Sequence, residues 1–232
     1  MIELRSGGLR AVVLPEAGGG LARLDWRGTP VLRPAPDGVA QPLPGQLACF
    51  PLVPWSNRIA PGGFEFNGRQ ITPAPTREGE PCPIHGDGWR LPWRLVSRGD
   101  SNAVLALDRR DGSPFAFTAT MDYALAGSAL HVTLRVVNCG ECELPFGLGL
   151  HPWMPHPEGA RLQARADGVW LSGADKLPAE HAALPPAWNF CGEAPQALPH
   201  DGVDNAFTGW DGRAQIDWPE RGLRLLIKAD MS

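Results

Sequence analysis

Apolar and polar residues alternate along the best-defined segments of this chain, and this period of two constrains its fold most strongly. The apolar members are Phe115, Phe117, Ala119, Met121, Tyr123 and Leu125 in one segment, and Leu130, Val132, Leu134 and Val136 in the next. Such alternation is typical of half-buried β-strands, because successive side chains point to opposite faces of a sheet. Gly127-Ser128 between the two segments predicts a hairpin with antiparallel neighbours.

Similar short strands are expected elsewhere along the chain. They fit the ranges 9–14, 21–26, 63–71, 93–96, 104–108, 160–166 and 223–229, with turn signals between them. We find no stretch of ten or more residues with a 3.6-residue period that lacks Pro or Gly. Many short strands with almost no helix predict an all-β fold, a large antiparallel sandwich or barrel. The Pro-rich segment 177–199 is interpreted as an irregular loop over a site, not as a domain boundary.

Composition narrows the class of protein further. A chain of 232 residues predicts one domain, 1–232, and 43% hydrophobic residues supply a core. The net charge of −4 and the lack of any basic run argue against a nucleic-acid or anionic-membrane partner. The N-terminus does not resemble a signal peptide, and no apolar run approaches the length of a membrane span. Five scattered cysteines do not suggest a disulfide framework, so we expect a cytoplasmic protein. The oligomeric state is not predicted.

Two motifs in the first half of the chain carry groups suited to a polar ligand. Asn57-Arg58 follows an extended, Pro-bounded segment and offers amide groups and a planar cationic fork. His85-Gly86 places an imidazole where the backbone can approach a ligand closely, and Trp89 offers an apolar face to a sugar ring. Taken singly, each has an ordinary alternative: a solvated surface arginine, a loop histidine and a core tryptophan.

Two further motifs lie in the second half. An apolar, glycine-broken strand ends at His151-Pro152, and the proline stops the strand so that the imidazole lies at its end. The segment Asp201 to Phe207 places the carboxylate of Asp204 just before an apolar pair. Alone, Asp204 is equally well explained as the cap of its own turn.

Together and in this order, the four motifs resemble the aldose 1-epimerase (galactose mutarotase-like) family. The strings Pro-Leu-Val-Pro-Trp-Ser-Asn-Arg-Ile and Ile-His-Gly-Asp-Gly-Trp, both within 50–93, carry most of the resemblance. It runs from about residue 9 to the end. The resemblance implies a large antiparallel β-sandwich whose concave face binds a free sugar, without a metal or organic cofactor. It further implies that Asn57, Arg58 and Asp204 hold sugar hydroxyls. His85 and His151 would face the ring oxygen, with His151 as the proton donor.

The residue types suit the implied reaction, the exchange of α and β anomers of an aldohexose. A base takes the proton of the C1 hydroxyl while an acid protonates the ring oxygen, and the ring opens. The C1–C2 bond then rotates, and the ring closes on the other face of the carbonyl. Imidazole suits the acid role because its unperturbed pKa is about 6.5.

The sequence departs from the family pattern after 223–229, where a further strand bearing a glutamate base is expected. Glu193 and Glu220 do not match that motif, so we expect a chain that is truncated at its C-terminus or has lost the base. Two alternatives to an epimerase of a free hexose follow. One is a carbohydrate-binding protein without turnover. The other is an epimerase of a hexose 6-phosphate, for which Arg77 and Arg90 flank His85.

One signal is set aside. Cys139 and Cys142 have the spacing of a redox or zinc motif, but they form a single pair in a predicted turn. Structural zinc normally takes four ligands at paired spacings, so no metal site is predicted.

Overall fold

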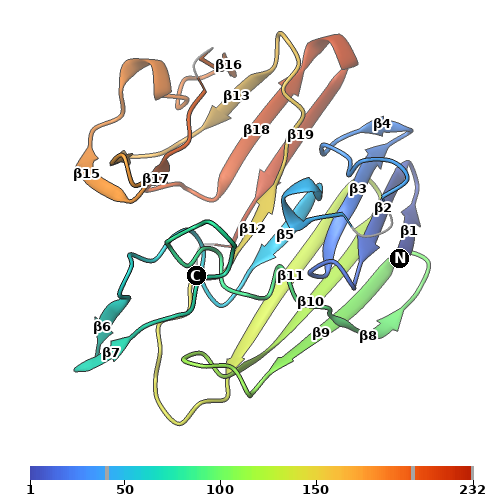
Figure 1. Cartoon of the computed structure of the whole chain (residues 1–232). Helices are drawn as coiled ribbons and strands as arrows, with labels where there is room; N and C mark the ends of the chain where they lie inside the picture. The colour runs from blue at the N-terminus through green and yellow to red at the C-terminus, as the bar shows by residue number, and fades with distance from the viewer. Residues whose placement is uncertain (40–41, 200–201, 231–232) are drawn as a thin grey trace. The chain divides into compact units, whose positions relative to one another are not determined.

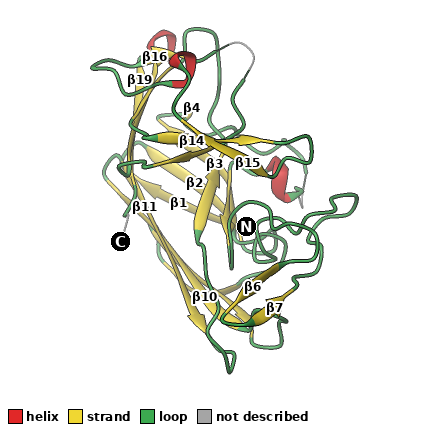
Figure 2. Ribbon diagram, turned by 90° about the vertical axis from the view of Figure 1, so that its left-hand side faces the viewer, coloured by secondary structure: helices red, strands yellow, loops and turns green. Residues whose placement is uncertain are grey.

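The computed structural model describes residues 1–39, 42–199 and 202–230. By its internal contacts the chain divides into two compact units, Met1–Pro155 and His156–Ser232. The expectation that 1–232 forms a single domain stays a prediction. Both units are built from antiparallel strands, and the only helices among the described residues are three short 3₁₀ turns, drawn red in Figure 2. The all-β antiparallel fold predicted from the alternation is therefore confirmed.

The first sheet of unit 1 carries the N-terminal strands. Its order is β1 (Ile2–Ser6), β2 (Leu9–Leu14), β3 (Gly20–Trp26), β5 (Cys49–Leu52) and β12 (Gly149–Pro152), with β4 (Thr29–Pro30) paired to β3. The sequence pattern predicted β2 and β3 but not β5, because all four residues of β5 are buried and no alternation is visible. A strand buried on both faces reads as a continuous apolar run.

The second sheet of unit 1 has the order β11 (Ala129–Asn138), β10 (Phe117–Ala126), β9 (Asn102–Arg109) and β8 (Arg94–Arg98), seen in green and yellow in Figure 1. The hairpin predicted at Gly127-Ser128 is present, since Ala126 pairs with Ala129. A separate hairpin joins β6 (Phe64–Phe66) to β7 (Arg69–Ile71). Its turn residues Asn67 and Gly68 both have positive φ, as a tight two-residue hairpin turn requires.

Alternate side chains of β10 form much of the core of unit 1. Its buried residues are Phe117, Ala119, Met121, Tyr123 and Leu125. The hydroxyl of Tyr123 donates to the carbonyl of Gly19 at 2.9 Å, just before β3, which satisfies a polar group that burial would otherwise leave costly. These contacts provide a rigid support for the loops between the strands.

Unit 2 contains two smaller sheets. One has the order β16 (Gln196–Ala197), β13 (Arg161–Ala164), β18 (Arg213–Trp218) and β19 (Leu223–Lys228), and the other β15 (Pro178–Ala182), β14 (Gly168–Ser172) and β17 (Ala206–Thr208). Segment 177–199 was expected to be an irregular loop. It is only partly irregular, because β15, β16 and a 3₁₀ turn at Pro186–Trp188 lie within it. The C-terminal truncation stays a prediction. Within the described ranges the structure contains no helix with the length and apolar character of a membrane span.

Candidate functional site

His151 is placed by the pairing of β5 with β12. In this antiparallel pair His151 lies opposite Phe50, and their rings stack with centroids 4.6 Å apart and planes 14° apart. Phe50 is only 3% exposed and belongs to an apolar cluster that includes Leu52 and Trp89. The imidazole therefore packs on a buried aromatic ring near the C-terminal end of β12, a strand whose residues are half-buried or exposed.

The Asn57 and His85 loops are joined by backbone hydrogen bonds. Arg58 and Ile84 form an isolated antiparallel bridge. The amide of His85 donates to the carbonyl of Asn57 at 3.0 Å, and the amide of Asn57 donates to Nδ1 of His85 at 3.0 Å. Both residues have positive φ, 64° and 62°, which is uncommon for side chains other than glycine. Two motifs about 28 residues apart in sequence thus form one local structure.

The structure brings the two histidines together. The ring centroids of His85 and His151 lie 5.6 Å apart, edge to face at 77°. Trp89 packs against His85 and Phe50: its ring lies 6.0 Å from that of His85 and stacks on Phe50 at 5.4 Å, and its indole N–H donates to the carbonyl of Gly86 at 2.7 Å. Since Trp89 is only 7% exposed, its visible contacts support the His85-Gly86 turn. Its predicted contact with sugar stays a prediction.

The environment of His85 keeps its ring neutral. Burial, and then the nearby His151 and Arg58 side chains, lower the pKa of His85 from 6.5 to about 4. Because Nδ1 accepts a hydrogen bond from a backbone amide, the proton of the neutral ring lies on Nε2. At neutral pH, His85 can therefore donate one hydrogen bond through Nε2 without carrying charge.

Arg58 has a partner, Glu80, that no sequence motif indicated. Its Nη2 lies 3.3 Å from Oε2 of Glu80, and each side chain is 17% exposed. The Nε of Arg58 is buried and has no hydrogen-bond partner among the described residues. The guanidinium is thus fixed at one edge by Glu80, while another edge keeps a donor for a ligand.

A second tryptophan adjoins the histidines and was not predicted. The ring of Trp153 lies 4.9 Å from that of His151, and the guanidinium carbon of Arg33 lies 4.4 Å from the Trp153 ring centre. Trp153 is 37% exposed, so part of its face is open to a ligand. Its position two residues after His151, on the same side of an extended chain, is the signal that could have identified it.

Asp204 lies in unit 2, exposed and two residues before the start of β17. The neighbouring Asn205 donates from Nδ2 to the carbonyl of Trp170 at 2.9 Å, which anchors this segment to β14. Asp201, at the start of the same motif, lies outside the described residues. The role of Asp204 in holding sugar hydroxyls stays a prediction.

A metal centre has no support in the described part of the chain. Over residues 1–39, 42–199 and 202–230, no three His, Cys, Asp or Glu side chains are grouped as metal ligands. The donor set around His85 instead consists of imidazole, guanidinium and amide groups. These groups suit the hydroxyl oxygens of a neutral polar ligand.

Comparisons with known proteins show which chains and folds this protein resembles. The chain is 37% identical over 213 residues to the uncharacterized protein YphB of Escherichia coli (strain K12), a match that covers 90% of this chain and 71% of YphB. It is 28% identical over 158 residues to the uncharacterized protein YihR of the same organism, covering 66% of this chain and 49% of YihR.

Solved structures show the same similarity. The crystal structure of a candidate aldose 1-epimerase from Escherichia coli K12 has a TM-score of 0.89 at 35% identity and covers 97% of this chain and 75% of its own. A galactose mutarotase-like protein from Clostridium acetobutylicum has a TM-score of 0.75 at 19% identity, covers 99% of this chain and 77% of its own, and shows the fold alone. The family model for aldose 1-epimerase matches residues 1–232. The chain therefore belongs to the aldose 1-epimerase family.

Proposed function

We propose that this protein is a cofactor-independent aldose 1-epimerase that interconverts the α and β anomers of a free hexose. The observation that carries the proposal is the pair of imidazoles, 5.6 Å apart beside the buried Phe50 ring, next to the bridge between Arg58 and Ile84. Family membership supports a sugar epimerase or mutarotase and a sugar substrate. The choice of a free hexose and the roles of individual residues are our inference.

The two histidines have different roles in the proposed mechanism. His85 is neutral at pH 7 and donates from Nε2 to a sugar oxygen. His151 is the general acid that protonates the ring oxygen. Arg58, Asn57 and Asp204 hold hydroxyls and fix the sugar in the orientation that the proton transfer needs. The exposed face of Trp153 adds an apolar surface for the C–H side of the sugar ring, whereas Trp89 is buried and supports the His85 turn.

Ring opening then follows in a balanced step. His151 gives a proton to the ring oxygen, the bond from C1 to that oxygen breaks, and a base removes the proton of the C1 hydroxyl as the carbonyl forms. After rotation about C1–C2, the reverse transfers close the ring on the other face. No electrons leave the sugar, so the reaction requires no redox partner.

Polarimetry of freshly dissolved α-D-glucose or α-D-galactose tests the proposal. The protein should accelerate the approach to anomeric equilibrium, and His151→Asn should slow it by about 10² to 10⁴, the usual contribution of one acid–base group. His131→Asn, at an exposed position of β11, is the matched control and should keep the wild-type rate. A wild-type rate equal to that of buffer alone would refute the catalytic proposal.

Sugar binding without turnover is the second candidate. It is supported by the neutral His85 and the Arg58–Glu80 ion pair, because both can hold hydroxyls without transferring a proton. Calorimetric titration with the same sugars, combined with polarimetry, distinguishes the two functions. Glucose 6-phosphate, used as a third sugar in the same two measurements, tests the hexose 6-phosphate alternative. The hexose 6-phosphate alternative requires an arginine that can pair with the phosphate. Arg90, one of its two candidates, already donates from its guanidinium to the carbonyl of Thr76.

A further inference from the structure

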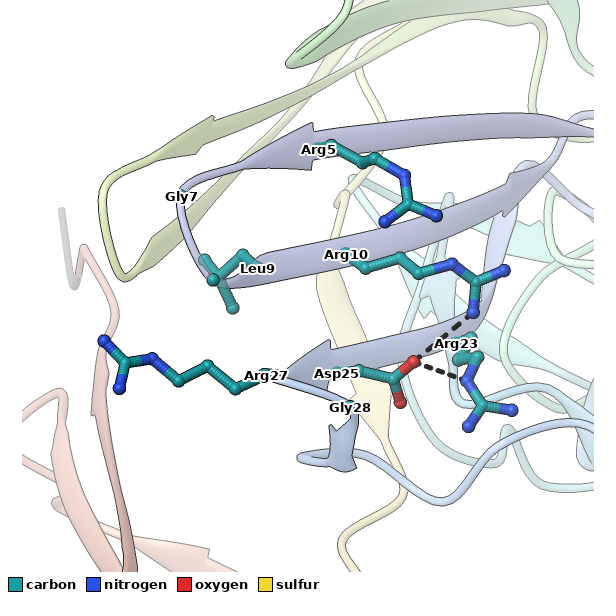
Figure 3. Close-up of a pocket in the computed structure, with 9 residues that line it drawn as sticks. Arg5, Gly7, Leu9, Arg10, Arg23, Asp25, Arg27 and Gly28 are labelled. Carbon is teal, nitrogen blue, oxygen red and sulfur yellow. Dashed lines mark hydrogen bonds and ion pairs between the residues drawn. The ribbon is translucent and has the colours of Figure 1, made fainter.

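A second pocket lies on the N-terminal sheet, away from the histidines. It has a volume of about 820 Å³, within the usual range of ligand pockets, and shares no lining residue with the candidate site. Cross-strand register builds it: Arg5 lies opposite Arg10, which lies opposite Asp25. Figure 3 shows these side chains on one face of β1, β2 and β3. We call this pocket the arginine groove.

Asp25 is the unusual member of the groove. It is only 3% exposed, and its Oδ2 accepts from Nε of Arg23 at 2.5 Å and from Nη1 of Arg10 at 3.4 Å. Its other oxygen, Oδ1, is buried and has no hydrogen-bond partner within the described ranges. A buried carboxylate oxygen is normally satisfied, so Oδ1 marks a position for a donor such as a hydroxyl.

The groove also has more positive than negative charge. Four guanidinium groups line it, and the carboxylates that pair with them are those of Asp25 and Glu3, in a chain whose net charge is −4. Arg27 contributes most to this surplus of positive charge, because its guanidinium carbon lies over the ring of Trp26, 5.2 Å from the ring centre, rather than beside a carboxylate. In Figure 3 the Arg27 side chain points away from the group formed by Arg10, Arg23 and Asp25, so the groove has two distinct ends.

Two glycines that line the groove differ in their surroundings. A Cβ on Gly8 would lie 2.9 Å from the Arg27 and Trp26 side chains, so the glycine allows both to lie across the β1–β2 turn. A Cβ on Gly28 would meet nothing within 4 Å. The turns therefore position Arg27 and leave the adjoining space unfilled.

We propose that the arginine groove binds a hydroxylated anion, a sugar acid or a sugar phosphate. One hydroxyl donates to Oδ1 of Asp25, and the acidic group lies toward Arg27. A simple anion would gain from the arginines but would leave Oδ1 without a donor. A neutral sugar would satisfy Oδ1 but would leave the surplus positive charge uncompensated. This site is separate from the one proposed for anomer exchange, and its ligand need not be the substrate.

Calorimetric titration with four probes tests the proposal: D-glucuronate, D-glucose 6-phosphate, D-glucose and inorganic phosphate. At the site that Arg27→Asn weakens, the first two should bind at least roughly tenfold more tightly than the last two, since each forms a charge-assisted contact and a hydroxyl contact. Binding should weaken as salt rises, because the arginines are partly exposed. Stronger binding of glucuronate indicates a sugar acid, and stronger binding of glucose 6-phosphate a sugar phosphate.

Variants assign the binding to the groove. Arg27→Asn removes a charge that has no ion-pair partner among the described residues, and Asn suits the positive φ of that position, so the fold should be retained while affinity falls roughly tenfold. Arg110→Asn, an exposed arginine outside the groove, is the matched control. Asp25→Asn should weaken binding of both hydroxylated anions. His85→Asn should leave unchanged the loss of affinity that Arg27→Asn causes, which keeps this result independent of the proposed epimerase activity.

Three results would overturn the proposal. Inorganic phosphate that binds as tightly as glucose 6-phosphate would show a site for ions alone. Glucose that binds as tightly as glucuronate at the site that Arg27→Asn weakens would show that the charge of the ligand has no role. Equal affinity of the wild type and Arg27→Asn for both hydroxylated anions would place their binding elsewhere.

Discussion

At the scale of single residues, Glu80 is expected to act as a positioning residue for Arg58. Glu80→Gln keeps the size of the side chain but removes the charge that fixes the guanidinium at 3.3 Å. We expect the KM for sugar to rise roughly 3- to 30-fold with little change in kcat, as for the loss of a contact that positions a binding group. Polarimetry at several sugar concentrations separates the two constants. Glu80→Asp should restore part of the affinity, and Glu65→Gln, at an exposed position of β6, should change neither constant.

The depressed pKa of His85 predicts a dependence of stability on pH. The unfolded imidazole takes up a proton near pH 6.5, whereas the folded one does so near pH 4. Between these values the unfolded state binds more protons, so this contribution to stability is present above pH 6.5 and is lost as the pH falls toward 4. Urea unfolding at pH 7.5 and pH 5 should show a smaller loss of stability for His85→Asn than for the wild type. Asn suits the left-handed backbone at this position. Equal losses would contradict a depressed pKa.

At the scale of elements, the strands with the longest alternation were predicted from the sequence, whereas the short strand β1 was not, although its residues also alternate between buried and exposed. β10 and β11 alternate strictly and were found with their hairpin, whereas β5 shows no alternation because it is buried throughout. The grouping of His85 with His151 rested on resemblance to a family, since no local pattern shows that residues 85 and 151 meet. Glu80 and Asp25 could not be identified, because their importance comes from partners that only the tertiary structure reveals.

The loop that carries His85 is held by Thr76. Its hydroxyl accepts from the amide of Ile84 at 2.8 Å and donates to the carbonyl of Ile84 at 2.6 Å, and Thr76 is 5% exposed. Thr76→Val keeps the shape but leaves two buried backbone groups unpaired, so we expect a loss of about 2–4 kcal/mol in the free energy of unfolding. Thr72→Val, at an exposed position with one hydroxyl contact at 3.2 Å, should cost less than about 1 kcal/mol. Chemical denaturation measures both, and equal losses would show that the Thr76 contacts do not hold the loop.

At the scale of the whole molecule, the remaining question is whether the second unit contributes to sugar binding. Asp204 is the proposed contributor, and it is exposed, so Asp204→Asn should not disturb the fold. If its carboxylate accepts from sugar hydroxyls, this variant should bind sugar roughly tenfold more weakly, the usual effect of losing one hydrogen bond to a charged group. Glu193→Gln removes an exposed charge from the same unit and should leave the affinity unchanged. Titration of both variants with the sugar that the wild type binds decides the point. Unaltered affinity in Asp204→Asn would confine the binding groups to the first unit, because every other proposed side chain lies between residues 57 and 153.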